Sequence, residues 1–247
     1  MPEPLLRVVD LVKSFPVRKG FFGQKVDRLV AVDGANLTLQ PRETFGLVGE
    51  SGCGKSTLGL TIMQLYEPTS GKVYFEGRDL TELKPDELRS ARRRMQMIFQ
   101  DPYASVDPRM TVEEIVREPM DVQGIGSPAE RIATAAELLV KCGVNATFMH
   151  RFPNEFSGGQ QQRIGIARAL TMRPKLLICD EPVSSLDVSV QAQILNLLRD
   201  LQDEFGLAYI FISHNIAVTA FMSHRIGVMY LGKMVEIGPS KTVLNAP

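Results

Sequence analysis

One glycine-rich stretch, residues 49–57 with the sequence GESGCGKST, constrains this chain more than any other. It follows the apolar run 44–48, which predicts a buried strand, and it precedes residues 58–65, which predict a helix. A strand, a glycine-rich loop with Lys-Ser and a helix together form a phosphate-binding loop. The sequence therefore predicts that the chain binds a nucleoside triphosphate.

Each residue type in this loop suits the binding of phosphate. The three glycines let the backbone approach the phosphates without Cβ clashes. The N–H groups of residues 52–57 then point into one concavity at the positive end of a helix. Lys55 adds a charge for the β- and γ-phosphates, and Ser56 offers a hydroxyl to Mg²⁺. The alternative is an ordinary glycine turn between strand and helix, but the flanking elements favour the phosphate loop.

Composition excludes several classes of protein. With 247 residues, 44% hydrophobic and 23% charged, the chain is an ordinary globular protein of one or two lobes. Its 28 basic and 28 acidic residues cancel, which argues against a general nucleic-acid binder. The three cysteines lack metal-ligand spacing and are expected to be reduced thiols in the cytoplasm. Apolar runs are shorter than about 18 residues and the N-terminus has no signal region, so we expect any membrane link to run through a partner.

The N-terminal segment predicts strands around a basic loop. Residues 5–15 alternate loosely and suit an edge strand, 16–29 predict a glycine-broken loop, and 29–39 resume strand character. Phe15 lies ahead of the phosphate loop, where an aromatic ring can stack on a purine base. The alternative is an ordinary core aromatic residue.

The middle of the chain, residues 101–170, predicts an all-helical insertion between two α/β segments. Thr111 begins a capping box for a helix that we expect Pro119 to end. Ser127 repeats the capping signature, with proline at the first helical position. The α/β pattern returns with the buried strand 175–179.

Polar residues follow the ends of the predicted strands, where α/β folds hold their ligands. Asp180 ends an apolar strand, the usual place for the carboxylate that holds the Mg²⁺ hydration shell. Glu181 is free to orient or polarise a water molecule. His214 ends the strand 207–213, within reach of a γ-phosphate, and Gln100 ends the run 95–99 and suits Mg²⁺. The alternatives are a helix-capping acid, a structural or exposed histidine and a surface glutamine.

A second anion site is predicted at residues 156–163, with the sequence FSGGQQQR. Ser157 is a good N-cap, and Gly158 and Gly159 expose N–H groups at the start of a helix that runs to Thr171. Two sites for a γ-phosphate on separate lobes indicate that each binds a different nucleotide, or that both bind one nucleotide from opposite sides.

With these motifs the chain resembles, over essentially its full length, the nucleotide-binding subunit of ATP-binding-cassette (ABC) transporters. Gln100 matches the Q-loop, 157–160 the signature, 176–181 the Walker B strand, 185–187 the D-loop and His214 the switch histidine. The neighbouring segments, such as IFQDPYASVDPR and VMYLGKMVEIG, are similar to the oligopeptide/dipeptide importer subfamily. Three departures are Phe156, where the signature usually has leucine, Asn215, where aspartate is common, and His224, which is unusual at its position.

The resemblance implies an α/β fold, a P-loop (RecA-like) ATPase core with an N-terminal antiparallel β-subdomain and an inserted all-helical subdomain. Residues 1–247 would form a single nucleotide-binding domain. Its core would comprise 1–100 and 171–247, and its helical signature subdomain 101–170. Subfamily members usually continue past the equivalent of Pro247 into a C-terminal extension, so we expect this sequence to be truncated or to be one half of a longer polypeptide.

The resemblance also implies a function: an ATP-binding and ATP-hydrolysing subunit that energises an importer of di- or oligopeptides or a related small solute. Its cofactors would be ATP and Mg²⁺. Its partners would be a second ATPase subunit, two transmembrane permease subunits and, indirectly, an extracytoplasmic solute-binding protein, with no nucleic acid. We expect it in the cytoplasm, peripheral on the inner face of the cell membrane. Two ATP molecules would be sandwiched in a head-to-tail dimer, which explains the two anion sites.

The matched motifs carry residue roles. The catalytic residues implied are Lys55, Gln100, Glu181 and His214. The residues implied to bind ATP within one subunit are Phe15, Gly49, Ser51, Gly52, Cys53, Gly54, Lys55, Ser56, Thr57, Gln100 and Asp180. Those implied to bind ATP of the other subunit are Ser157, Gly158, Gly159, Gln160 and Asp187. The metal would be held by Ser56, Gln100 and Asp180.

Three other classes were weighed. ABC ATPases of DNA repair or chromosome maintenance insert coiled coils or zinc modules between phosphate loop and signature, whereas here only 107 residues separate Gly49 from Phe156 (156 − 49). Translation-associated ABC proteins carry two cassettes joined by a charged linker, and one cassette is found here. A structural subunit that binds but does not hydrolyse ATP is disfavoured because Glu181 and His214 are both present.

Overall fold

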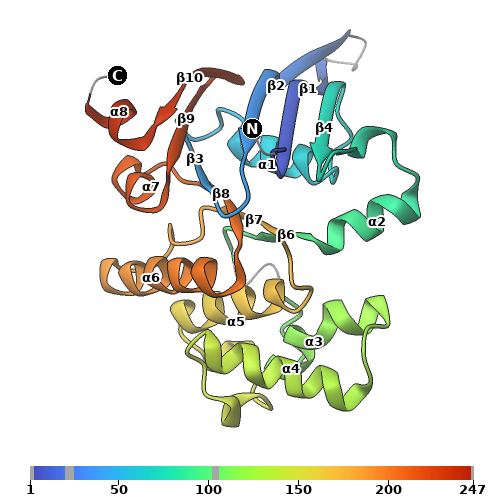
Figure 1. Cartoon of the computed structure of the whole chain (residues 1–247), viewed down its shortest axis with the longest axis vertical. Coiled ribbons are helices and arrows are strands. Elements are labelled where there is room, and N and C mark those ends of the chain that lie inside the picture. The colour runs from blue at the N-terminus through green and yellow to red at the C-terminus, as the bar shows by residue number, and fades with distance from the viewer. Residues whose placement is uncertain (1–2, 20–24, 102–105, 246–247) are drawn as a thin grey trace. The chain divides into compact units, whose positions relative to one another are not determined.

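The computed structural model describes residues 3–19, 25–101 and 106–245, without the side chains of 18–19 and 25–27. The chain divides into two compact units. The first unit comprises Met1–Arg92 and Ala208–Pro247, and the second unit comprises Arg93–Leu207. In Figure 1 the first unit runs from blue to cyan and again in red, and the second from green to orange.

The first unit begins with an antiparallel sheet in the order β2-β1-β4-β5. Its strands are β1 (Leu6–Lys19), β2 (Lys25–Leu39), β4 (Ser70–Phe75) and β5 (Arg78–Asp79). Because β1 pairs with both β2 and β4, the prediction of an edge strand at its position is wrong. Alternation of apolar and polar residues indicates that one face of a strand is buried, but it does not indicate how many neighbouring strands it has within its sheet.

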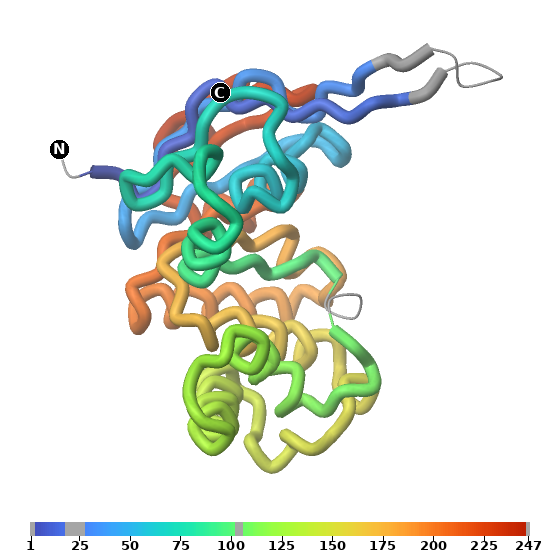
Figure 2. Tube along the Cα trace, turned by 90° about the vertical axis from the view of Figure 1, so that its right-hand side faces the viewer, coloured from blue at the N-terminus to red at the C-terminus, as the bar shows by residue number. Residues whose placement is uncertain are grey.

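The predicted loop at residues 16–29 is also wrong where the structure describes it. The strands β1 and β2 remain paired beyond the expected ends, with Pro16 opposite Arg28 and Lys19 opposite Lys25. They run side by side as a long two-stranded ribbon in Figure 2. Such a ribbon is held by backbone hydrogen bonds, so its side chains need no apolar pattern. The remaining residues of the predicted loop, 20–24, lie outside the described residues.

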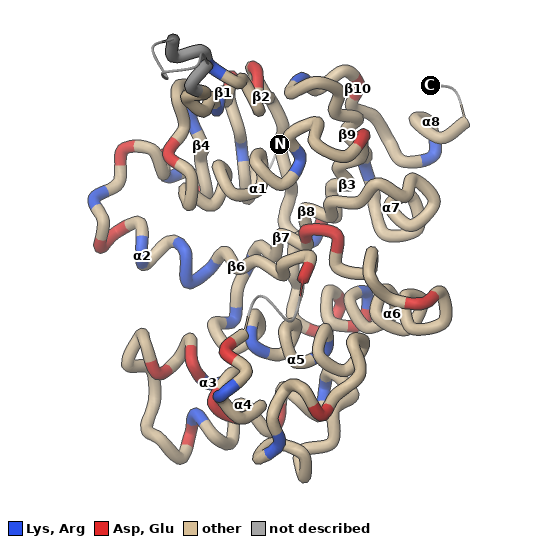
Figure 3. The backbone as a smooth tube through the Cα atoms, turned by 180° about the vertical axis from the view of Figure 1, so that it is seen from behind, with Lys and Arg blue, Asp and Glu red and all other residues tan. Residues whose placement is uncertain are grey.

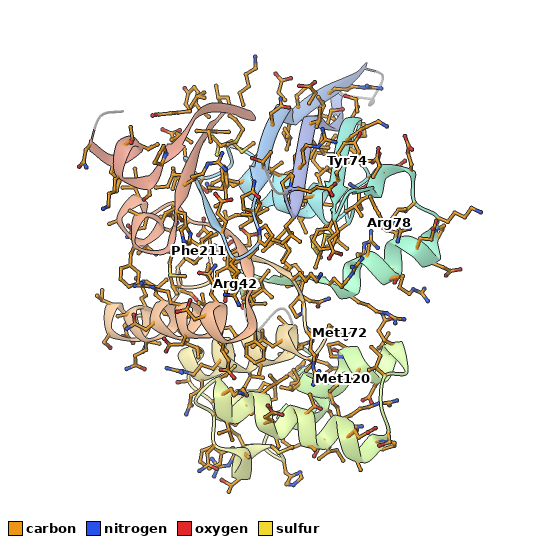
Figure 4. The ribbon with its side chains drawn as sticks, viewed as in Figure 1. Arg42, Tyr74, Arg78, Met120, Met172 and Phe211 are labelled. Atoms are coloured by element: carbon orange, nitrogen blue, oxygen red, sulfur yellow. The ribbon has the colours of Figure 1, made fainter. Side chains whose placement is uncertain are left out.

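A second sheet in the first unit carries the phosphate loop. Its strands lie in the order β10-β9-β3-β8. The strand β3 (Thr44–Val48) is parallel to β8 (Ala208–Ile212) on one side and to β9 (Arg225–Tyr230) on the other. Every residue of β3 and β8 is buried, including Phe211, which is labelled in Figure 4. Continuous apolar runs are typical of such parallel strands, because both faces of the sheet are covered.

Helices and a hairpin complete the first unit. The hairpin joins β9 to β10 (Lys233–Pro239). Its two turn residues, Leu231 and Gly232, both have positive φ, as in the two-residue turns that match strand twist. The helices are α1 (Lys55–Ile62), η1 (Leu80–Glu82), α2 (Pro85–Arg93), which ends at the unit boundary, α7 (Ile216–Met222) and α8 (Ser240–Asn245).

The second unit combines two parallel strands with a group of helices. The strand β6 (Met95–Ile98) pairs with β7 (Leu176–Asp180). The helices α3 (Val112–Gln123), α4 (Pro128–Lys141) and α5 (Gly158–Leu170) pack on one another, and α5 also contacts α6 (Val188–Phe205). Two short helices, η2 (Ala146–Phe148) and η3 (Pro153–Glu155), precede α5.

The observed elements agree with the predicted fold class. The N-terminal sheet is antiparallel, the phosphate loop follows a parallel strand, and the described residues between β6 and β7 form helices without strands. The helical subdomain boundaries at 101 and 170 stay a prediction.

The observed helix caps agree with the sequence prediction, whereas one helix ends at a different residue from the predicted one. Thr111 and Ser127 both form complete capping boxes. The expected end of α3 at Pro119 is wrong, because the helix continues to Gln123 and closes at Gly124 with a φ of +64°. A proline inside a helix removes one backbone hydrogen bond. Burial of apolar side chains of α3, such as Met120 (Figure 4), favours continuation of the helix.

Two surface properties bear on the class of protein. Acidic and basic residues are interspersed in each unit (Figure 3), in keeping with a net charge of zero. Among the residues that the structure describes, none of the helices combines the length and the apolar character that crossing a bilayer requires.

Packing around β3 generates a prediction. A Cβ on Gly46 would lie 2.3 Å from Cγ2 of Thr219 and 2.4 Å from Oγ of Ser223, so Gly46→Ala should overpack the contact with α7. We expect it to lower the free energy of unfolding by about 1–3 kcal/mol. The control is Gly165→Ala, where a Cβ meets no described atom within 4 Å. Because alanine favours the helix interior, this variant should gain up to about 1 kcal/mol. Urea unfolding measures the free energy of unfolding of both variants. Equal effects of the same sign would contradict the close packing inferred at Gly46.

Candidate active site

The phosphate loop in the first unit has a backbone that requires glycine. Gly49, Gly52 and Gly54 have φ values of +156°, +78° and +108°. A Cβ on Gly49 would lie 2.1 Å from the carbonyl oxygen of Met229, and one on Gly54 would lie 2.0 Å from that of Ala31. Close packing on β9 and β2 is therefore a second reason for these glycines, one that the sequence pattern does not reveal.

Lys55 is the first residue of α1, and its charge is held at the loop. The ammonium group donates to the carbonyl oxygens of Gly49 and Glu50, both at 2.8 Å, and the residue is 5% exposed. The start of α1 has no side-chain cap and no acidic residue in its first turn. The first turn of this helix therefore brings no carboxylate of its own to the positive helix end, which suits the binding of phosphate. Ser56 and Thr57 lie half-buried in the same turn.

The hairpin of the same unit supports this loop. The N–H of Gly232 donates to the carbonyl oxygen of Cys53 at 2.9 Å, and the carbonyl oxygen of Gly232 accepts from the N–H of Asp33 at 2.8 Å. The hairpin turn is therefore linked by hydrogen bonds to both the loop and β2. Ser51 and Gly52 are exposed at the loop.

Phe15 lies on β1 within a small aromatic group. Its ring meets the ring of Tyr66 edge to face, with 5.3 Å between the centroids. The ammonium of Lys13 lies 5.0 Å from the Phe15 centroid and donates to the carbonyl oxygen of Glu67 at 2.7 Å. Phe15 is half-buried, and stacking on a purine stays a prediction.

His214 follows β8 and is exposed between two hydrogen-bonded neighbours. The hydroxyl oxygen of Ser213 accepts from the N–H of Asn215 at 3.0 Å. The side chain of Asn215 caps α7 by accepting from the N–H groups of Ala217 and Val218. Asparagine and aspartate cap helices about equally well, so the departure at position 215 preserves the turn that presents His214.

In the second unit, β7 leads directly into the predicted catalytic carboxylates. Asp180 ends the strand and is 7% exposed. Glu181 follows with a φ of +46°, a conformation that non-glycine residues rarely adopt and that costs about 1–3 kcal/mol. The side-chain amide of Gln100 donates to Oε2 of Glu181 at 3.3 Å. The structure therefore brings together two residues that the sequence separates widely.

The predicted signature turn is presented by its own helix cap. The hydroxyl of Ser157 accepts from the N–H of Gln160 at 3.4 Å, and the Gln160 side chain accepts from the N–H of Ser157 at 3.0 Å. Ser157 and Gln160 are exposed, Gly158 is half-buried and Gly159 is buried. The serine cap is confirmed, and its closure by Gln160 was not predicted although the spacing of a capping box signals it.

The two glycines of this turn let it pack against the start of α6. A Cβ on Gly159 would lie 2.4 Å from Cγ1 of Val190, and one on Gly158 would lie 3.4 Å from Cδ2 of Leu186. Asp187 caps α6 by accepting from the N–H of Val190 at 3.0 Å. The hydroxyl of Ser189 and the N–H of Val190, which both donate to Asp187, hold the pKa of its carboxyl below the usual value.

One positioning residue was missed by sequence reasoning. Gln161 is 4% exposed, and its side-chain amide donates to the carbonyl oxygens of Pro153 at 2.6 Å and Phe156 at 3.3 Å. These bonds fix the chain just before Ser157. The burial of Gln161 beside the predicted anion site identifies it in the structure, and the sequence does not reveal that burial.

Metal binding is judged from the chemistry of the available donors. Among the described residues, no three His, Cys, Asp or Glu side chains form a group that suits a metal ion. Cys53, Cys142 and Cys179 are free and buried, and burial raises the pKa of Cys142 to about 12. The predicted donors are instead a hydroxyl, an amide and one buried carboxylate. These hard oxygen donors fit Mg²⁺, which keeps several waters and takes few protein ligands.

A strand, a glycine loop with a held lysine, and an uncapped helix define a P-loop nucleotide-binding protein. Comparison with known proteins is more specific. The family model described as "ABC transporter" matches residues 32–184. The chain belongs to the ABC transporter family, and it is an ATPase of this type.

Individual relatives and structures agree. The chain is 52% identical over 246 residues to "Oligopeptide transport ATP-binding protein AppF" of Bacillus subtilis, covering 99% of this chain and 75% of that protein. It is 49% identical to "Glutathione import ATP-binding protein GsiA" of Escherichia coli K12, covering 99% of this chain but 39% of GsiA. The cassette MJ0796, solved as a dimer bound to ADP and Pi, matches 95% of this chain and 98% of its own, with 31% identity and a TM-score of 0.83.

The hydrogen-bonded ammonium group of Lys55 leads to a testable prediction. Lys55→Ala removes a buried ammonium at the loop, and we expect the affinity for ATP to fall by roughly 100-fold, because hydrogen bonds to charged groups are strong. The control is Lys84→Ala, which removes an exposed lysine from another part of the first unit. Calorimetric titration with ATP measures both. Unchanged affinity in Lys55→Ala would contradict the assignment of the phosphate loop.

Proposed function

We propose that this chain binds and hydrolyses ATP to energise an importer of di- or oligopeptides or of a related small peptide such as glutathione. Support comes from the relatives, whose names describe oligopeptide, peptide and glutathione transport. The observation that supports the proposal best is that one chain contains two features. These are a phosphate loop with a buried lysine and a capped serine-glycine turn with exposed polar residues.

In the proposed mechanism the phosphate loop binds the triphosphate within one subunit. The N–H groups of residues 52–57 and the Lys55 ammonium offset the negative charge that spreads over the transferring phosphoryl group. Lys55 can exchange its bonds to two loop carbonyls for bonds to phosphate oxygens without leaving the loop. Phe15 stacks on the base, and His214 holds the γ-phosphate and the attacking water in line.

Glu181 acts as the general base. Its carboxylate accepts a proton from the attacking water while the water oxygen bonds to the γ-phosphorus and the bond to the leaving ADP oxygen breaks. The amide of Gln100 keeps the carboxylate oriented before the water arrives, as its 3.3 Å contact with Oε2 indicates. The position of Gln100 would therefore change when the site is occupied, and the segment that carries Gln100 would move with it.

A Mg²⁺ ion would be held by Ser56, Gln100 and Asp180. When bound, it supplies charge neutralisation between the phosphates. The burial of Asp180 favours a partner cation, because a buried carboxylate is stabilised by an opposite charge.

A second ATPase subunit completes each site. The exposed residues Ser157 and Gln160, with Gly158 and Gly159 between them, would bind the γ-phosphate of the nucleotide held by the partner, and Asp187 would approach the same site. The dimeric solved cassettes of similar fold support this arrangement. ATP would draw the subunits together, and hydrolysis would release them. Two permease subunits would carry the motion to the membrane, with the ATPase on its inner face and a solute-binding protein on the other side.

The function is tested in the complete transporter. With the chain assembled on its permease subunits in proteoliposomes, a solute-binding protein loaded with peptide should raise ATP turnover several-fold over the empty binding protein. Glu181→Gln in the same assembly should retain ATP binding, while turnover falls by about 10²–10³-fold, the usual scale for loss of a general base.

Two results would count against the proposal. If loaded binding proteins leave turnover unchanged across peptides and glutathione, the substrate class is wrong. If Glu181→Gln turns over near the normal rate, Glu181 is not the base. Asp203→Asn, which changes an exposed acid on α6 of the same unit, serves as the control and should leave turnover unchanged.

A further inference from the structure

The backbone at Glu181 has a conformation that its sequence neighbours do not favour. Its φ is +46°, and it precedes Pro182. Proline disfavours the right-handed helical region for the residue before it, and side chains with a Cβ rarely adopt the left-handed region. The turn after β7 must therefore be held by bonds from outside Glu181 itself.

Ser184 supplies two such bonds to one atom. Its backbone N–H donates to the carbonyl oxygen of Glu181 at 3.2 Å, and its hydroxyl donates to the same oxygen at 3.1 Å. Ser184 is half-buried, so water competes weakly for these bonds. At the other end of the residue, the carboxylate accepts from Gln100 at 3.3 Å. Glu181 is thus held at its main chain and at its side chain by different residues.

We propose that Ser184 is a positioning residue for hydrolysis, which keeps Glu181 in its left-handed conformation. The direction of a side chain from the backbone follows from φ and ψ. Relaxation of the turn would therefore swing the carboxylate away from the attacking water, although the carboxylate itself would be intact. The hydroxyl of Ser184 acts through Glu181 and contacts no reacting atom. This inference rests on the proposed role of Glu181 as general base.

A double-mutant cycle on the full chain tests it. Wild type, Ser184→Ala, Glu181→Gln and the double variant are compared for kcat, for KM of ATP and for thermal unfolding. Ser184→Ala should lower kcat by roughly 3–10-fold with little change in KM, as expected when a catalytic group is slightly misplaced. In the Glu181→Gln background the same change should alter residual turnover by less than about twofold, because the group that it positions is already gone.

Two further variants separate positioning from folding. Thr171→Val removes a hydroxyl that also donates to a carbonyl three residues earlier, that of Arg168 at 2.7 Å, in the same unit. It matches the lost bond in type and should lower stability while leaving kcat unchanged. Ser184→Thr keeps the hydroxyl and should keep kcat within about twofold of wild type.

The outcomes are distinguishable. Three results would each overturn the role of Ser184. The first is full turnover in Ser184→Ala, and the second is an equal loss of kcat in the wild-type and Glu181→Gln backgrounds. The third is a loss of kcat in Ser184→Thr as large as that in Ser184→Ala. These results would leave the proposed function standing. Normal turnover in Glu181→Gln alone would instead remove Glu181 as the base, and the positioning role would fail with it.

Discussion

The structure depends on a backbone conformation that places N–H groups and one lysine around a point where phosphate can bind. Three glycines with positive φ form that backbone, and at two of them, Gly49 and Gly54, the carbonyls of Met229 and Ala31 leave no space for a Cβ. The surrounding elements keep the loop in place. The strand β3 is buried between two parallel strands, and the hairpin turn is bonded to Cys53. A change in any of these elements is therefore expected to reach the phosphate site.

The second unit carries the groups that we propose act on a nucleotide bound by other residues. Capping bonds within Ser157–Gln160 hold the signature turn, and Asp187 caps the next helix. Glu181 has a backbone strained by about 1–3 kcal/mol, which two bonds from Ser184 offset. Local hydrogen bonds thus fix the predicted catalytic residues before ATP is present. Such preorganisation is the main source of catalysis in phosphoryl transfer.

Sequence reasoning succeeded where the signal is local. The strand and the helix that flank the phosphate loop and the capping boxes at Thr111 and Ser127 are each specified by a few adjacent residues. It failed where neighbours distant in the sequence decide. The place of β1 inside its sheet, the long β1–β2 ribbon and the passage of α3 through Pro119 all depend on tertiary contacts. The bonds of Gln161 and Ser184 were missed for a different reason: their partners are close in the sequence, but a backbone carbonyl that accepts a side-chain bond carries no sequence signal.

The central claim, which we propose, is that two ATPase subunits each offer the half-site that the other lacks, and mixing two inactive variants of this chain tests it most directly. Lys55→Ala disables the phosphate loop and Ser157→Arg blocks the signature turn, so each variant alone should hydrolyse almost no ATP. In a one-to-one mixture, half of the dimers combine both chains and hold one intact site, so about a quarter of wild-type turnover should return. A mixture as inactive as its components, or wild-type turnover by Ser157→Arg alone, would contradict the claim.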